Sequence, residues 1–235
     1  EDKIVQRACV MLLSAIYDHD FYDFSHGFRS GHSQHGALKE FERHCREKNI
    51  NWIVDADVSG FFDNLDHAIL REFIQKRVND GGIKRLIGKW LNAGVVEDGQ
   101  WTRSDQGTPQ GGVISPLLSN IYLNEVDKML ERAKKVTRQG RFTYIEYARF
   151  ADDLVVLVDG FWKWKWLLKA AYKRLVEEFE KLDVQMNQDK TRVVDLTQDQ
   201  TFSFLGFDYR RRKTRRKVWG VSVTPRMNAR TALLR

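Results

Sequence analysis

The feature that most constrains this chain is the stretch RFADDLVVLV at residues 149–158, where two adjacent aspartates stand before an unbroken apolar run. The run is short and rich in valine, which predicts a buried β-strand over residues 154–158. Another strand is predicted at residues 143–150, so only A-D-D separates the two and a hairpin is expected. Its tip would carry Asp152 and Asp153. Adjacent carboxylates repel each other and lose hydration near a core, so this placement needs a chemical reason.

A third carboxylate is predicted at the end of another strand. Residues 55–67 read DADVSGFFDNLDH, and Asp57 lies where the expected strand 51–58 gives way to a small-residue turn. If the three carboxylates meet, their repulsion requires a cation, and oxygen ligands without His or Cys favour Mg²⁺ over zinc. Two such ions serve phosphoryl transfer in polymerases and nucleases. A lone Asp-Asp pair is more often a solvated surface feature, and it is Asp57 that favours the metal site.

The remaining pattern predicts an α+β chain of one large domain or two interlocked subdomains. Asp55 is interpreted as a structural or solvated acid, and Asp66 as the N-cap of a helix. Expected helices cover residues 4–17, 34–46, 67–78, 83–91, 113–133 and 164–182. Further strands are expected at residues 202–209 and 218–223, with a hairpin at 95–103.

The net charge of +7 is concentrated in one place. Residues 210–217 read RRRKTRRK, whose seven basic side chains equal the whole excess, so the rest of the chain is balanced. Such a run suits a polyanion such as nucleic acid, although a solvated turn between two strands is compatible with it. No run of about 18 apolar residues indicates a membrane span. Cys9 and Cys45 lie far apart without metal-ligand spacing, which favours a reducing, cytoplasmic setting, with an organelle left open.

Six motifs, in order, resemble those of the reverse transcriptase domain encoded by group II introns and their bacterial relatives. The most specific is GTPQGGVISPLLSNIYLNEVD at residues 107–127. The others are HGFRSGHSQHGAL at 26–38, DADVSGFFDNLDH at 55–67, ARFADD at 148–153, MNQDKT at 186–191 and FLGF at 204–207.

The resemblance implies a right-hand polymerase fold, with fingers and an antiparallel palm sheet flanked by helices. It places fingers at residues 1–50 (incomplete at the N-terminus) and 67–110, and palm at 51–66 and 111–209. Residues 210–235 would form a basic hairpin and the start of a connection to an absent thumb. Without a thumb, we expect weak or no processive synthesis by this chain alone.

The resemblance assigns Asp57, Val58, Asp152 and Asp153 to a site for two Mg²⁺ ions, for which Mn²⁺ could substitute. Lys190 would protonate the departing pyrophosphate, unless it is an ordinary exposed lysine.

Four nucleotide contacts are implied besides Val58. They are Arg29 on the triphosphate, Phe62 under the sugar, where a 2′-hydroxyl would clash, and Gln110 with Gly111 beside the nucleotide. The alternatives are core packing for Phe62 and a tight turn for residues 110–111. The chain has Ser30 and His32 where the family carries Pro and Arg, which leaves Arg29 without its usual basic partner.

Primer and nucleic-acid contacts are expected from the second half of the chain. They comprise the turn Phe204, Leu205 and Gly206, whose aromatic neighbours could equally be core, and the basic side chains Arg210, Arg211, Arg212, Lys213, Arg215 and Arg216. The run WKWKW at residues 162–166 is interpreted as core packing with lysines reaching to solvent, with base stacking or a membrane surface as alternatives.

The leading hypothesis is an RNA-directed DNA polymerase that belongs to a group II intron maturase acting in splicing and retrohoming. Its partners would be an RNA template, a DNA or RNA primer, dNTPs and structured intron RNA, without a membrane; a homodimer is left open. Two alternatives are a splicing maturase whose polymerase activity is secondary and a bacterial defence enzyme such as a CRISPR-linked reverse transcriptase. An RNA-synthesising polymerase is disfavoured by Phe62.

Overall fold

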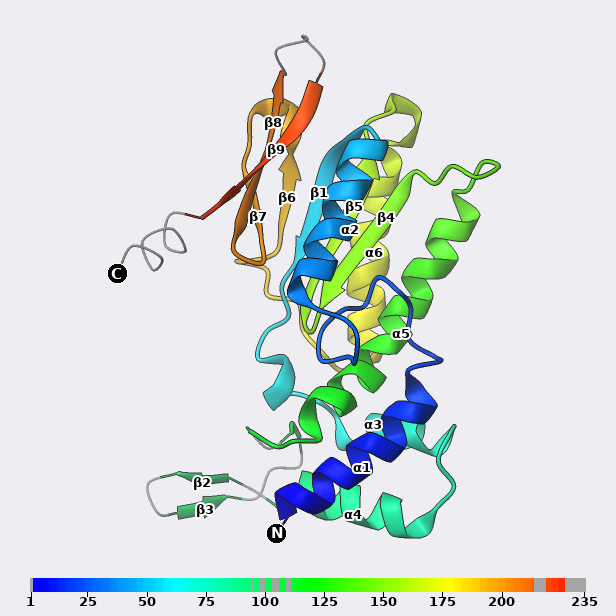
Figure 1. Cartoon of the computed structure of the whole chain (residues 1–235), viewed down its shortest axis with the longest axis vertical. Coiled ribbons are helices and arrows are strands. Elements are labelled where there is room, and N and C mark those ends of the chain that lie inside the picture. Colours follow the sequence, from blue (N-terminus) through cyan, green and yellow to red (C-terminus); the bar gives the residue numbers. More distant parts are fainter. Residues whose placement is uncertain are drawn as a thin grey trace.

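A four-stranded antiparallel sheet forms the centre of the fold (Figure 1). The computed structural model describes residues 2–93, 95–97, 100–102, 106–108, 111–213 and 219–226. The strand order is β4-β5-β1-β6, which differs from the sequence order because β1 is inserted beside the later hairpin. The strands are β1 Ile50–Ala56, β4 Ile145–Phe150, β5 Asp153–Asp159 and β6 Arg192–Asp195. The predicted strands 143–150 and 154–158 are thereby confirmed as a hairpin; β6 was not predicted.

The described part of the chain contains six α-helices: α1 Asp2–Tyr17, α2 Gln34–Glu47, α3 His67–Gln75, α4 Gly81–Leu91, α5 Ser115–Val136 and α6 Trp166–Lys181. Helices α2, α5 and α6 pack against the sheet, while α1, α3 and α4 lie beyond its lower end (Figure 1). Because successive strand residues point to opposite faces, the sheet is apolar on both sides. Trp52 and Val54 of β1 join the core formed with α1, α3, α5 and α6. Ile53 joins a separate core with α2 and the C-terminal strands.

The C-terminal strands form a three-stranded sheet over the second core. They are β7 Phe202–Phe204, β8 Phe207–Lys213 and β9 Trp219–Pro225, while β2 Val95–Glu97 and β3 Gln100–Thr102 make a separate hairpin. The prediction of one continuous strand over 202–209 was wrong. Leu205 and Gly206 both have positive φ, 47° and 83°, which is the pattern of a two-residue hairpin turn. The basic residues 210–213 consequently lie within β8 rather than in a turn.

The predicted helix cap at Asp66 is confirmed, and other local features follow from the sequence. The Asp66 carboxylate accepts a hydrogen bond from the Ile69 backbone N–H at 2.7 Å and so caps α3. Pro116 lies in the first turn of α5, where its missing N–H costs nothing. Cys9 and Cys45 are free and buried. None of the helices in the described ranges combines the length and apolarity that crossing a bilayer requires.

Candidate functional site

The hairpin tip between β4 and β5 presents the first two predicted carboxylates. Phe150 pairs with Asp153, so Ala151 and Asp152 form the two-residue turn. Ala151 has φ 58°, a left-handed conformation that a non-glycine residue adopts only at a cost of order 1 kcal/mol or more. This strain lies next to Asp152, which indicates that neighbouring contacts hold the tip in one conformation.

Asp57 reaches the same end of the sheet from β1. Ala56 of β1 is paired with Leu154 of β5, so Asp57 leaves β1 beside the residue that precedes Leu154, which is Asp153. The segment 186–191 fixes the backbone there, because Asn187 donates its N–H to the Asp57 carbonyl at 2.9 Å. The Asp57 N–H in turn donates to the Thr191 hydroxyl at 3.2 Å. The structure thus brings Asp57, Asp152 and Asp153 to one edge, as predicted.

The three carboxylates are coupled electrostatically. Partial burial, followed by the nearby charges of Asp152, Asp55 and Asp57, raises the pKa of Asp153 to about 6. Asp57 forms an ion pair with Lys190, whose Nζ lies 3.8 Å from the Asp57 Oδ2. Within the described ranges, no three His, Cys, Asp or Glu side chains converge closely enough to enclose an ion. The donor set nevertheless fits a hard dication, because it is oxygen-only and its three carboxylates carry more negative charge than Lys190 offsets.

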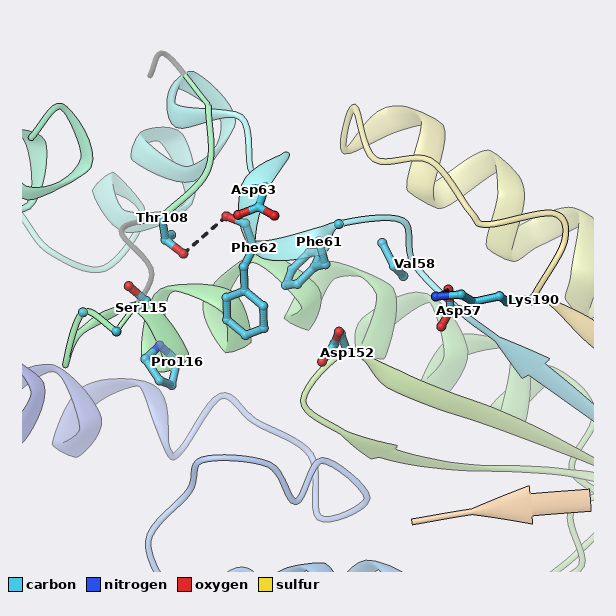
Figure 2. A pocket seen from close by; sticks show the side chains of 13 residues that line it. Asp57, Val58, Phe61, Phe62, Asp63, Thr108, Ser115, Pro116, Asp152 and Lys190 are labelled. Atoms are coloured by element: carbon cyan, nitrogen blue, oxygen red, sulfur yellow. Dashed lines mark hydrogen bonds and ion pairs between the residues drawn. The ribbon is translucent and has the colours of Figure 1, made fainter. Parts of the chain in front are cut away.

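A cavity of about 550 Å³ opens beside Asp57 and Asp152 (Figure 2). Phe62, Asp152 and Lys190 all line this cavity, and Figure 2 labels their side chains. Phe61 is buried while Phe62 is only partly buried. The other lining residues, most of them not predicted, are Val58, Gly60, Phe61, Asp63, Thr108, Gly111, Gly112, Ser115 and Pro116.

The segment 106–108 holds the backbone that carries Phe62. The Thr108 N–H donates to the Phe62 carbonyl at 2.7 Å, and the Gly107 N–H donates to the Leu65 carbonyl at 2.8 Å. Gly107 has φ 83°, and a Cβ there would lie 2.7 Å from the Asp63 carbonyl oxygen, so only glycine fits. Gly111 reaches the cavity as predicted, whereas Gln110 lies outside the described residues.

Arg29 has contacts unlike those that the sequence suggested. Its guanidinium donates to the Tyr22 and Ser25 carbonyls at 2.7 and 2.8 Å and forms an ion pair with Asp18 at 3.2 Å. Its side chain is only 6% exposed and is not among those lining the cavity. Arg29 therefore fixes the loop of residues 18–29 in this structure, and its contact with a triphosphate stays a prediction. His32 is half-buried, and its ring centroid lies 5.3 Å from that of His26.

The predicted primer turn lines a second cavity of about 550 Å³. Phe204, Leu205 and Gly206 meet Asp57 and Asp153 there. The turn is tied to α2, because the Gln34 side chain donates to the Leu205 carbonyl at 3.0 Å. Phe204 is itself buried and belongs to the second core, so its contribution to the cavity is largely that of a scaffold. The cavity also includes Ser203, Arg192 and Arg226, which sequence reasoning missed.

The described part of the basic run, residues 210–213, lines neither cavity. Arg211 donates to the side chains of Asn51 and Asn49 at 2.6 and 3.1 Å, near the start of β1 and at the opposite end from Asp57. Arg210, Arg212 and Lys213 are exposed along β8. Arg215 and Arg216 lie outside the described residues.

A buried arginine that sequence reasoning missed supports the hairpin tip. Arg149 and Asp127 are both fully buried and joined by two hydrogen bonds, of 2.9 and 2.6 Å. Arg149 also donates to the Ala151 carbonyl at 2.7 Å, to the Asn120 side chain at 2.9 Å and to the Ser25 hydroxyl at 2.6 Å. In the sequence, the polar residues Asn120 and Asp127 within the otherwise apolar segment of α5 were the available sign of a buried polar cluster.

The loop of residues 24–29 packs directly on this tip. The Arg149 N–H donates to the Phe24 carbonyl at 2.9 Å, and the His26 N–H donates to the Arg149 carbonyl at 2.8 Å. A Cβ on Gly27 would overlap the Ala151 backbone. Gly27 therefore permits a close approach that no other residue allows.

Comparison with known proteins agrees with this geometry. A family model described as reverse transcriptase (RNA-dependent DNA polymerase) matches residues 1–209. Protein YkfC of Escherichia coli is 33% identical over 97% of this chain and 66% of its own length. The group II intron-encoded protein LtrA of Lactococcus lactis is 30% identical over 91% of this chain and 43% of its own length. The chain thus spans just under two thirds of the first relative and under half of the second.

Solved structures confirm the fold at low sequence identity. A telomerase from Candida tropicalis superposes with a TM-score of 0.67 over 94% of this chain and 45% of its own, at 16% identity. A telomerase from Candida albicans gives 0.63 over 87% of this chain and 35% of its own, at 13% identity. The predicted α+β polymerase architecture of fingers and palm is confirmed; the individual domain boundaries stay predictions.

Proposed function

The chain belongs to the reverse transcriptase (RNA-dependent DNA polymerase) family, and from that premise we propose that it joins deoxynucleotides to a primer 3′-hydroxyl on an RNA template. The observation that carries the proposal is the register of β1 with β5, which delivers Asp57 to the hairpin tip beside a cavity containing Phe62. Template, primer and dNTPs are therefore the partners that we assign to the two cavities.

Asp57, Asp152 and Asp153 would hold Mg²⁺ at this edge of the sheet. Two ions held there would lower the pKa of the primer hydroxyl and neutralise the charge of the leaving pyrophosphate. The strands position the carboxylates. Because β1 and β5 are paired along their length, the carboxylates at their ends are fixed relative to each other. Mn²⁺, with similar preference for oxygen ligands, would substitute.

Phe62 and Lys190 would act on opposite parts of the nucleotide. Phe62 is held by the Thr108 and Gly107 hydrogen bonds to its turn, so its ring can exclude a 2′-hydroxyl without moving. The Lys190 ammonium lies near Asp57, and this ammonium would donate a proton to the departing pyrophosphate. The turn of residues 204–206, beside Asp57 and Asp153, would steady the primer end.

The test is primer extension on an RNA template with Mg²⁺. We expect wild-type extension with dNTPs, loss of it in Asp152→Ala, and incorporation of ribonucleotides by Phe62→Ala at least tenfold faster than by wild type. Phe179→Leu, a change in a buried ring that lines neither cavity, is the control and should leave sugar selection unchanged. Absence of wild-type extension would refute the polymerase assignment. Extension that survives Asp152→Ala would refute the metal-ion mechanism assigned to the aspartates, and a Phe62→Ala enzyme that still rejects ribonucleotides would refute only the role of Phe62.

A second function follows from two named relatives, the group II intron-encoded protein LtrA and nuclear intron maturase 3 of Arabidopsis thaliana, which is 24% identical over 87% of this chain. We propose that the full-length protein also binds structured intron RNA and assists its splicing. Splicing that is restored in a maturase-deficient host by Asp152→Ala would support a role separable from catalysis. Failure of the wild-type protein to restore it would remove this second function.

A further inference from the structure

A branched cluster of six aromatic rings occupies the end of the palm sheet opposite to the aspartates. We call it the distal aromatic surface; it comprises Phe142, Tyr144, Phe161, Trp162, Trp164 and Trp166. Neighbouring ring centroids are 4.9 Å apart for Phe142 and Tyr144, and 4.5 Å for Tyr144 and Trp164. One branch continues from Trp164 to Trp166, with centroids 6.1 Å apart. The other branch leads from Tyr144 to Phe161, with centroids 6.5 Å apart, and from Phe161 to Trp162, with centroids 6.2 Å apart.

The outer rings of this surface are exposed. Trp162 is 73% exposed and Trp166 is 55% exposed, while Trp164 is only partly buried against the core. The expectation that WKWKW packs into the core was therefore wrong for two of its three tryptophans. Tryptophan is seldom left this exposed without a partner, because its ring carries a large apolar area. Trp164 anchors the segment and presents its neighbours to solvent.

The surroundings of these rings are cationic. Lys163 lies 6.0 Å from the Phe161 centroid and 5.8 Å from that of Trp162. Lys48 lies 5.0 Å from the Phe142 centroid. Exposed basic side chains continue along both adjoining connections, at Lys135, Arg138 and Arg141 and at Lys165 and Lys169. The nearest acids on the same strands, Glu146 and Asp159, are buried, and Glu146 is already paired with lysines.

The basic strand β8 adjoins the same surface. Gly160, which precedes Phe161, donates its N–H to the Asn49 carbonyl at 2.6 Å, and a Cβ on it would overlap the Asn51 side chain. Asn49 and Asn51 are the residues that Arg211 binds. In Figure 1 the connection from β5 to α6 and the far end of β8 lie at the upper end of the molecule, away from the β4–β5 turn. The seven residues of β5 separate the two ends by roughly 20 Å.

We propose that the distal aromatic surface binds an unpaired nucleic-acid strand, separately from the template and primer in the cavities. Successive bases would stack on the Trp162 and Trp166 rings, and their phosphates would meet Lys163, Lys165 and Arg211. Stacking on exposed aromatic rings with interleaved cations is the mode by which sequence-tolerant proteins bind single strands. The inference does not depend on catalysis, because none of these residues touches the aspartates.

Ring geometry and charge favour a nucleic-acid strand over a lipid surface. The side chains that project are planar aromatic rings with exposed lysines beside them, and Val136 is the aliphatic side chain of the adjoining connections that is comparably exposed in the described part of the chain. Insertion into a bilayer instead needs a continuous apolar face. Anionic lipid also attracts lysine, however, so vesicles belong in the test.

The experiment measures binding of a 4-thiouridine-containing 12-mer, as RNA and as DNA, with both cavities saturated by a blunt RNA–DNA hybrid. The test variant is Trp162→Ala/Trp166→Ala. Trp162→Phe/Trp166→Phe keeps the rings, and Met11→Ala/Leu12→Ala removes equally exposed apolar side chains, 66% and 61% exposed, from α1. Photocrosslinks are mapped by peptide, and phosphatidylserine vesicles form a parallel arm.

We expect the alanine pair to weaken oligonucleotide binding at least tenfold, in line with the loss of two stacking platforms. The phenylalanine pair and the α1 pair should stay within about threefold of wild type, crosslinks should fall on residues 161–166, and single-nucleotide incorporation should be unchanged. Equal oligonucleotide affinity in wild type and the alanine pair would overturn the proposal. So would crosslinks that fall elsewhere, or a defect confined to vesicle binding.

Discussion

At the scale of single residues, the site depends on a buried charge that never touches the substrate cavity. Arg149 has its guanidinium nitrogens bonded to Asp127, Asn120, Ser25 and the Ala151 carbonyl. Burying an arginine is costly unless its partners are all present, and here they are. The consequence is a hairpin tip whose strained Ala151 is fixed from the inside, one residue from Asp152.

Removing one partner of this pair should destabilise the whole fold. Asp127→Ala would leave the Arg149 charge buried without its counter-ion, so the free energy of unfolding should fall by about 3–5 kcal/mol. Chemical denaturation at neutral pH measures it. The control is Glu42→Ala, which breaks an exposed pair with Arg46 at 3.1 Å and should cost less than about 1 kcal/mol. Equal effects of the two substitutions would contradict this account of Arg149.

Glu40 predicts a pH dependence of stability. Burial alone would raise its pKa, but hydrogen bonds and attraction from His26 and His44 outweigh burial and lower the pKa to about 2. A carboxyl whose folded pKa is depressed stabilises the fold above its unfolded pKa, about 4.5, and loses that contribution as the pH falls toward 2. Glu40→Gln should therefore cost on the order of 2 kcal/mol at pH 7 and much less at pH 3. A cost that is the same at both pH values would contradict this.

At the scale of elements, the loop of residues 24–29 and the β4–β5 hairpin act as one unit. Gly27 lies so close to the Ala151 backbone that any side chain would push the hairpin tip away. The position of Asp152 consequently depends on a residue more than a hundred positions earlier in the chain.

Gly27→Ala should reduce both stability and nucleotide incorporation. The added methyl group must displace backbone rather than a flexible side chain, so we expect a loss of about 1–3 kcal/mol and at least tenfold in rate. Gly88→Ala is the matched control, because its Cβ would meet nothing within 4 Å inside α4 and alanine favours helix. Thermal unfolding and single-turnover kinetics measure the two effects. A Gly27→Ala enzyme with wild-type rate would disprove the coupling.

Local sequence patterns predicted individual turns and caps well, but they predicted contacts between distant parts of the chain poorly. The hairpin at Asp152 and the cap at Asp66 both follow from neighbours in sequence, so they could be predicted. The Arg149 cluster could not, because its partners come from residues 25, 120 and 127 and only the folded chain joins them. The strand pattern over residues 202–209 missed the turn at Leu205, which only the family resemblance implied, because leucine is a poor residue for positive φ and the surrounding structure imposes it.

At the scale of the whole molecule, the sheet has two functional ends. Asp57, Asp152 and the two cavities lie at one end, and the distal aromatic surface with Arg211 lies at the other. Both ends follow from the same strand order, because β1 and β5 are paired antiparallel from Ile50 and Asp159 to Ala56 and Leu154. Chemistry and the proposed second nucleic-acid contact can therefore be altered independently by mutation.

The central claim is that Asp57, and not acidity in general, serves the reaction at this end of the sheet. The measurement is the single-turnover rate of one dNTP addition by Asp57→Asn and by Asp55→Asn, which lies two residues earlier at the end of β1, with one charge removed in each. Asp55 is already paired with Arg192 at 3.1 Å and does not line the first cavity. We predict a loss of at least hundredfold for Asp57→Asn and of no more than about threefold for Asp55→Asn. Equal losses, or a wild-type rate in Asp57→Asn, would contradict the assignment.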